Sequence, residues 1–137
     1  MRKQILTLAL ALSFTVVSMN ARSADQAVKA VIEKNADKGF RLTDAATKTL
    51  DLEFQGLTTD RVAAVPAKSL VFYRDQVGIY RNEDGWLKLI PVKLKHRSGE
   101  SALIEGQQLR KGMKFAVKGV SLLRVADIDA FSGGEAP

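Results

Sequence analysis

Short apolar segments separated by tight-turn residues, between Val65 and Lys118, constrain the fold more than any other feature of this chain. Along these segments apolar and polar residues alternate with the two-residue period of a half-buried strand, and helical periodicity is absent. Asp84-Gly85 is the strongest turn, because this dipeptide accepts the positive φ that a tight hairpin demands. The expected strands are residues 70–73, 77–80, 86–94, 101–105 and 113–118, with further turns at 74–76, 98–99 and 110–112. This spacing predicts a mainly β protein, built as a small antiparallel barrel or sandwich.

One or two short helices are expected before these strands. Within residues 25–37 several apolar side chains fall near one face of a helix, and Gly39 follows as a typical helix stop. Residues 40–42 alternate as a short strand. Thr43-Asp44 can then cap a second short helix that runs to about position 50 or 52, because their side-chain oxygens accept hydrogen bonds from free backbone donors. Residues 54–57 return to extended structure.

The first 24 residues have the three-part pattern of a secretory signal peptide. Arg2-Lys3 precede an apolar run over residues 5–17, and Ala21-Arg22-Ser23 follow as a small-x-small cleavage pattern. The apolar run is shorter than the roughly 20 residues that a membrane-spanning helix needs. We therefore expect cleavage, and a periplasmic product if the host is a Gram-negative bacterium.

Four parts of the chain are expected: a signal peptide at 1–24, a helical and extended segment at 25–57, a β-rich domain at 58–125, and a flexible C-terminal tail at 126–137. The last six residues, 132–137, are a low-complexity run. After cleavage the chain suits one small domain and is too short for two independent cores. It contains no Cys, so packing alone must hold this exported domain together.

The positive charge of the chain shrinks once the signal peptide is removed. The whole sequence has a net charge of +6, from 21 Lys and Arg against 15 Asp and Glu. Residues 1–24 contain Arg2, Lys3 and Arg22 and no acid, so 18 basic residues and a net charge of +3 are left. Export and this modest charge argue against a nucleic-acid partner.

Residues 65–123 resemble the last, membrane-proximal domain of periplasmic adaptors, the HlyD-like membrane fusion proteins of tripartite and resistance-nodulation-division efflux systems. In that family a Val-Pro-x-x-Ala-Leu strand leads to a Pro-Val strand and then to a Gly-Leu-x-x-Gly-x-x-Val-Val-x-x-Gly turn. The positions that match are Val65, Pro66, Leu70, Pro91, Val92, Leu109, Gly112, Val117 and Gly119. Residues 40–43 and the short helix after them are also similar to the segment at which metal-efflux adaptors enter their barrel domain.

The resemblance covers only part of what an adaptor contains. Gln108 stands where the family has Gly, and Phe115-Ala116-Val117 replace its run of valines. Between Gly56 and Val65 there is no room for the biotinyl-lipoyl-like domain or the long helical hairpin of a full adaptor. The resemblance implies docking to an inner-membrane transporter or a full-length periplasmic adaptor. It leaves open whether copies of the chain assemble into a homo-oligomer, and whether the chain is a folded remnant of a larger adaptor gene.

Catalysis and metal binding find little support among the residues. The single His96 lies between cations, with no neighbouring carboxylate to orient it, and we interpret it as a polar residue at a strand end. After signal cleavage Met113 is the one Met left, and there is no Cys, so three soft ligands for one metal ion cannot be assembled within one copy. We expect a protein that binds partners, with no enzymatic activity, no cofactor and no metal site.

Two surfaces are candidates for binding. For docking to a transporter or adaptor we expect an exposed basic face, because surface charge steers association; its members are Lys93, Lys95, Arg97, Arg110 and Lys111. The alternative function is a free-standing periplasmic module for a small ligand or an envelope polymer. That module would bind its ligand at a barrel mouth lined by Tyr80 and Trp86.

Overall fold

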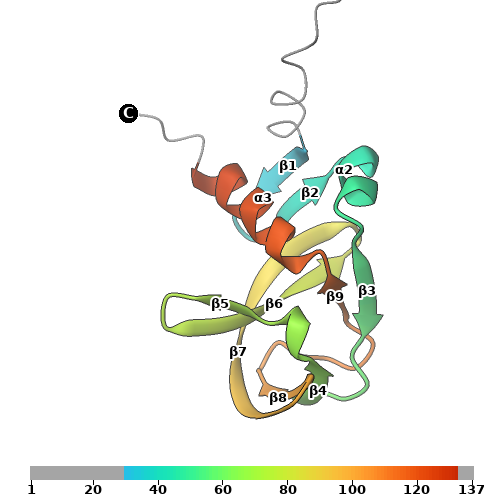
Figure 1. The fold of residues 1–137 in the computed structure, drawn as a ribbon. Helices are drawn as coiled ribbons and strands as arrows, with labels where there is room; N and C mark the ends of the chain where they lie inside the picture. Colours follow the sequence, from blue (N-terminus) through green and yellow to red (C-terminus); the bar gives the residue numbers. More distant parts are fainter. Residues whose placement is uncertain (1–29, 133–137) are drawn as a thin grey trace, which may run out of the picture.

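The centre of the fold is a long hairpin of two strands, β6 (Gln76–Glu83) and β7 (Trp86–Ser98) (Figure 1). Asp84 and Gly85 form its turn with φ values of 53° and 84°, and two successive positive values match the twist of the flanking strands. The computed structural model describes residues 30–132, so the expected signal peptide lies outside the described residues. No helix within the described range is long and apolar enough to cross a membrane.

Seven further strands pair antiparallel around this hairpin. One path of paired strands runs in the order β1-β2-β7-β6-β9-β3, β5 pairs with β6, and β8 joins β7 to β4. The expected mainly β, antiparallel fold with short helices is confirmed, and the sheet is not closed into a barrel, which is compatible with the sandwich form. The further strands are β1 (Val31–Asn35), β2 (Gly39–Leu42), β3 (Glu53–Gly56), β4 (Val62–Pro66), β5 (Val71–Tyr73), β8 (Ser101–Glu105) and β9 (Lys114–Lys118). The helical elements are α2 (Asp44–Thr49), the short 3-10 turn η1 (Ala67–Ser69) and α3 (Val120–Ser132).

Strand alternation sends neighbouring residues of the central sheet to its opposite faces, so two core clusters share this one sheet and neither is independent of the other. Tyr80 points to one side and Ile79 to the other, and Ala116 and Phe115 divide in the same way. The helix-side core lies under α3, α2 and β2 and consists of Phe40, Leu42, Val71, Tyr80, Leu87, Ala116, Val120 and Leu123. The strand-side core lies against β4 and β8 and consists of Leu57, Ala63, Val65, Leu70, Ile79, Val92, Ala102, Ile104, Leu109, Phe115 and Val117. In Figure 1 these two covering layers lie above and below the central strands.

The expected helix at 25–37 is wrong over its described part, where residues 31–35 form the strand β1 and residues 36–38 a turn. The Oδ1 atom of Asn35 accepts hydrogen bonds from the backbone N–H groups of Asp37 (2.8 Å) and Lys38 (3.0 Å). Gly39 then starts β2 with φ of 98°, and a Cβ atom there would lie 1.9 Å from the backbone oxygen of Leu87. Gly39 is therefore needed for the close approach of β2 to β7, and it does not end a helix. Residues 25–29 lie outside the described residues.

The short helix expected after Thr43 is confirmed as α2. The hydroxyl of Thr43 accepts a hydrogen bond from the backbone N–H of Ala46 at 3.0 Å, which is the N-cap contact that the sequence predicts. Leu50 ends the helix and packs with Ala46 against the helix-side core. The strand expected at 40–42 is confirmed as part of β2.

The flexible tail expected from residue 126 is wrong for 126–132, which continue α3. Leu123 is fully buried in the helix-side core. The Tyr80 hydroxyl donates a hydrogen bond to Oδ2 of Asp127 at 2.8 Å, and Arg124 contacts the same oxygen at 3.3 Å. These contacts dock the helix on the sheet and keep its second half ordered. Residues 133–137 lie outside the described residues.

Candidate functional site

An open groove of about 970 Å³ runs over β7 at the point where this strand changes partner. Val92 is the last residue of β7 that pairs with β6, and Lys93 is the first that pairs with β8. At this point β7 passes from the start of β6 to the end of β8, so the ends of two strands flank it here. The lining residues are Asp75, Gln76, Val77, Pro91, Val92, Lys93, Leu94, Lys95, Glu105, Gly106, Gln107 and Gln108.

The charged groups of this groove are only partly paired. Lys95 Nζ lies 3.2 Å from Oε2 of Glu105, with both side chains about half exposed to solvent. None of the ion pairs within residues 30–132 includes Lys93 or Asp75. An exposed pair such as Lys95–Glu105 contributes only ~0–1 kcal/mol to stability, so Glu105 mainly neutralises its lysine. Among the described residues, the ammonium group of Lys93 and the carboxylate of Asp75 are therefore the two charges of the groove that form no ion pair.

The basic face expected from simple alternation along β7 is interrupted by a β-bulge. The register shifts between Leu94 and His96, so Lys93 lies opposite Glu105 whereas Arg97 lies opposite Ala102. Glu105 and Ala102 are an odd number of positions apart on β8, and residues directly opposite each other share a face of the sheet. Arg97 is thus on the other face from Lys93, and it does not line the groove. The expectation of one continuous face through all three residues is wrong.

Arg110 and Lys111 lie in the loop between β8 and β9 and are also outside the lining of the groove. Arg110 Nη1 donates hydrogen bonds to the carbonyl oxygens of Gln107 (2.7 Å) and Leu109 (2.9 Å). The backbone N–H of Lys111 donates to Oδ1 of Asp60 at 2.7 Å. Arg110 therefore holds the backbone of Gln107, which lines the groove. Of the five expected cations, only Lys93 and Lys95 line the groove.

The second pair of candidates, Tyr80 and Trp86, does not form a shared mouth. Tyr80 has no exposed surface, and it packs edge-on against Phe40 at a centroid distance of 6.3 Å. Burial, followed by the hydrogen bond to Asp127, raises the pKa of the Tyr80 phenol well above its ordinary value. Trp86 is half-buried on another rung of the hairpin, and its ring lies under Lys38. A ligand at Tyr80 would first have to displace the helix-side core.

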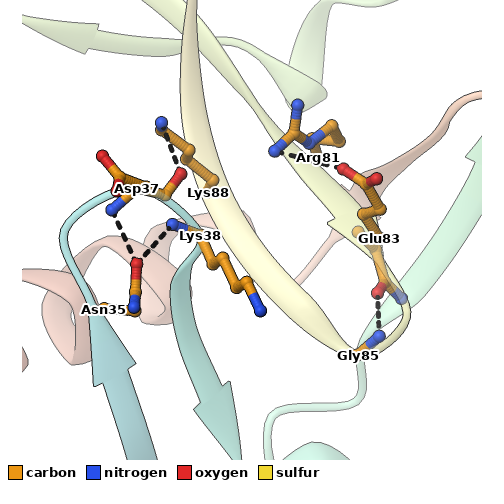
Figure 2. A network of polar contacts seen from close by, with 8 residues as sticks. Asn35, Asp37, Lys38, Arg81, Glu83, Gly85 and Lys88 are labelled. Carbon is orange, nitrogen blue, oxygen red and sulfur yellow. Dashed lines mark hydrogen bonds and ion pairs between the residues drawn. The ribbon is translucent and has the colours of Figure 1, made fainter.

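Two cations of the central hairpin, Lys88 and Arg81, are engaged in structural contacts, as Figure 2 shows for the β1–β2 turn and the β6–β7 hairpin. Lys88 Nζ donates to the carbonyl oxygen of Asp37 at 2.7 Å and fastens that turn to β7. On β6, the strand next to β7, Arg81 Nη2 lies 3.3 Å from Oε2 of Glu83. Lys93 takes part in no such contact within residues 30–132, and neither do Arg97 of β7 and Lys114 of β9.

His96 lies opposite Leu103 on the exposed part of β7, away from the groove lining. Within residues 30–132 there is no group of three or more His, Cys, Asp or Glu that could hold a metal ion.

Sequence reasoning missed the carboxamides of Gln76, Gln107 and Gln108. They come from two segments about 30 positions apart, and no local pattern marks any of them. The comparisons add no further evidence, since no family model, curated protein or solved structure matches this chain.

Proposed function

We propose that this chain is a periplasmic docking module of an efflux or secretion system, which binds an inner-membrane transporter or a full-length adaptor. The observation that carries the proposal is the open groove over β7, with the unpaired ammonium group of Lys93 in its lining. An exposed charge steers protein association, and the apolar surface beside it contributes through its burial. The class of partner comes from the resemblance of residues 65–123 to the membrane-proximal domain of adaptors.

The folded chain offers this groove without an evident catalytic arrangement among its described residues. Because the groove is already open in the folded chain, binding requires no rearrangement of the two cores. The partner covers the rim formed by the start of β6 and the end of β8, while α3 and the helix-side core lie on the far layer of the central sheet.

A photo-crosslinking experiment in the native envelope tests this function. A photoreactive amino acid at position 93 is expected to capture a transporter or a full-length adaptor, identified by mass spectrometry. The control places the same group at Lys48, which is exposed on α2 and outside the groove. Capture of the same proteins from both positions, or of none from position 93 in a folded and abundant protein, would contradict the proposal.

The alternative function, a small-ligand or envelope-polymer module, is supported by the size of the groove. A volume of about 970 Å³ lies at the upper end of the range for small-molecule sites. In this version the ligand occupies the groove over β7, and Tyr80 plays no part in binding it. A screen of envelope metabolites and glycan fragments by thermal shift separates the two functions: a stabilising ligand whose effect is lost in Lys93→Gln supports the alternative.

A further inference from the structure

We infer that the groove over β7 binds an extended polypeptide segment that places an acidic side chain against Lys93. This inference rests on the proposed docking function and names the chemistry of the segment that the partner supplies. It draws on the shape of the groove, the side chains on its two walls, and its unpaired charges.

The shape of the groove suits an extended chain. Its lining includes the five consecutive residues 91–95 of β7. A strand rises about 3.3 Å per residue, so this stretch is roughly 15 Å long and matches four or five residues of an extended segment. Val77, Pro91 and Leu94 supply apolar lining on which small aliphatic side chains of such a segment can pack.

The two walls carry side chains that can pair with a peptide backbone. Gln76 lies on the β6 wall, and Gln107 and Gln108 lie on the wall after β8. None of the side-chain hydrogen bonds within residues 30–132 uses the carboxamide of any of these three residues. A carboxamide offers donors and an acceptor, which are the same groups that a peptide unit presents.

The charges of the groove decide which side chain the segment carries. Glu105 lies opposite Lys93 on β8, but its ion pair is with Lys95, and within the described part of the chain no carboxylate lies at ion-pair distance from Lys93. An aspartate or glutamate opposite Lys93 therefore completes an ion pair. Asp75, in the turn between β5 and β6, also lines the groove, where its carboxylate can accept hydrogen bonds from backbone N–H groups of the same segment.

A flat, ring-stacking ligand is a poorer fit to this groove. The lining contains no aromatic side chain, and stacked rings gain their specific attraction from aromatic partners. An extended peptide requires only the apolar contacts, the amides and the charge that the groove provides.

Peptide binding to the chain without its expected signal peptide, residues 25–137, tests the inference directly. The probe is a fluorescein-labelled, end-capped octapeptide of alternating glutamate and valine, followed by fluorescence anisotropy. Peptides with glutamine or lysine in place of glutamate are the comparisons. We expect the glutamate peptide to bind about fivefold more tightly than the glutamine peptide, the effect of one exposed ion pair, and the lysine peptide more weakly still.

Variants at Lys93 show whether this preference comes from the groove. Lys93→Gln is expected to abolish the difference between the glutamate and glutamine peptides, and Lys93→Glu to reverse the preference toward the lysine peptide. The matched control is Lys68→Gln, an exposed lysine of η1 that does not line the groove. All three variants replace an exposed side chain, and unchanged melting curves verify that they fold. An acidic preference that survives Lys93→Glu, or no binding of any peptide at millimolar concentration, would overturn the inference.

The crosslinking experiment keeps this inference distinct from the proposed function. If the fragment captured at position 93 belongs to a transporter or adaptor but is a lysine-rich segment, the acidic-segment inference fails while the docking function stands. If that fragment is acidic, both are supported. If position 93 captures no envelope protein, the docking function fails, whatever the synthetic peptides do.

Discussion

The two layers that cover the central sheet are attached to it in different ways. On the strand side β8 pairs with β7, and β4 pairs with β8, so backbone ladders connect that layer continuously to the sheet. On the helix side a single residue pair, Phe40 with Leu87, joins β2 to β7, and α3 docks through side chains: Leu123 in the core, the Tyr80–Asp127 hydrogen bond, and Lys34, whose Nζ donates to the carbonyl oxygen of Ala130. A ladder holds its strand at every second residue, whereas a docked helix depends on a few contacts. We therefore expect damage to the helix side to stay local and damage to the strand side to spread.

The largest expected effect comes from Gly39→Ala at the helix-side hairpin. The new Cβ would lie 1.9 Å from the oxygen of Leu87, at a φ of 98° that L-residues rarely adopt. We expect the free energy of unfolding in urea to fall by at least about 3 kcal/mol. The control is Gly99→Ala in the strand-side hairpin, where φ is 59° and nothing lies within 4 Å of the added Cβ, so the loss should be about 1 kcal/mol. Similar losses for the two variants would contradict the close approach of β2 to β7.

A pair of core truncations compares the two layers directly. Leu123 on the helix side and Ile104 on the strand side both have no exposed surface, and each change to Ala should remove about 3 kcal/mol of stability. Amide hydrogen exchange distinguishes them. Leu123→Ala should lower protection mainly in α3, while Ile104→Ala should lower it in β4, β7 and β8 together. Loss of protection throughout the sheet in Leu123→Ala would show that the helix-side layer is as tightly coupled as the other.

The contact between α3 and the sheet predicts a dependence on alkaline pH. Burial and the hydrogen bond to Asp127 raise the pKa of Tyr80, so above about pH 10 the unfolded chain loses a proton that the folded chain keeps. This contribution to stability is fully present below that pH and is lost as the pH rises above it. Tyr80→Phe should cost about 1–2 kcal/mol at neutral pH and make the alkaline decline shallower.

Tyr73→Phe is the control for this titration, because Tyr73 lies beside Arg124 but its hydroxyl does not contact Asp127. It should retain the alkaline decline of the unsubstituted protein in urea titrations between pH 8 and 11. An unchanged pH profile in Tyr80→Phe would contradict this prediction, because it would show that the Tyr80–Asp127 hydrogen bond does not make the docking of α3 dependent on pH.

The smallest effect is expected from Lys118→Ala at the end of β9. Lys118 Nζ lies 2.6 Å from Oδ2 of Asp51 and 3.7 Å from Oε1 of Glu53, and the hydrogen bond to Asp51 raises the pKa of Lys118. These side chains are exposed, so solvent screens their attraction. We expect a melting temperature equal to that of the unsubstituted protein within error. A clear drop would mean that this edge of the helix-side layer depends on ion pairs more than on packing.

The strands of the central hairpin and of β8 could be predicted because their signals are local. Asp84-Gly85 specifies its turn by itself, and the alternation on either side of it needs no knowledge of distant residues. The segment of β1 gave the wrong prediction for the opposite reason. Its apolar spacing also fits a helix face, and the choice of strand depends on pairing with β2 and on the fit of Gly39 against Leu87.

The candidate site was predictable only in part. Lys93 and Lys95 follow from alternation along β7, but the bulge before His96 moves Arg97 to the other face, and nothing in the local sequence marks that bulge. Gln76 and Gln107 lie beside the groove because β7 exchanges β6 for β8 at Lys93. That exchange of partners is a property of the topology, and a single strand does not encode it.

The sequence by itself determined the mainly β class, the central turn, the N-cap of α2 and the basic character of β7. Each of these depends on residues within a few positions of one another, where propensity and alternation act directly. Only the tertiary structure decided that β1 is a strand, that residues 126–132 are helical, that Tyr80 is sealed in a core, and that Lys93 faces an open groove. Those outcomes arise from contacts between segments far apart in the chain, whose free energy outweighs local preference.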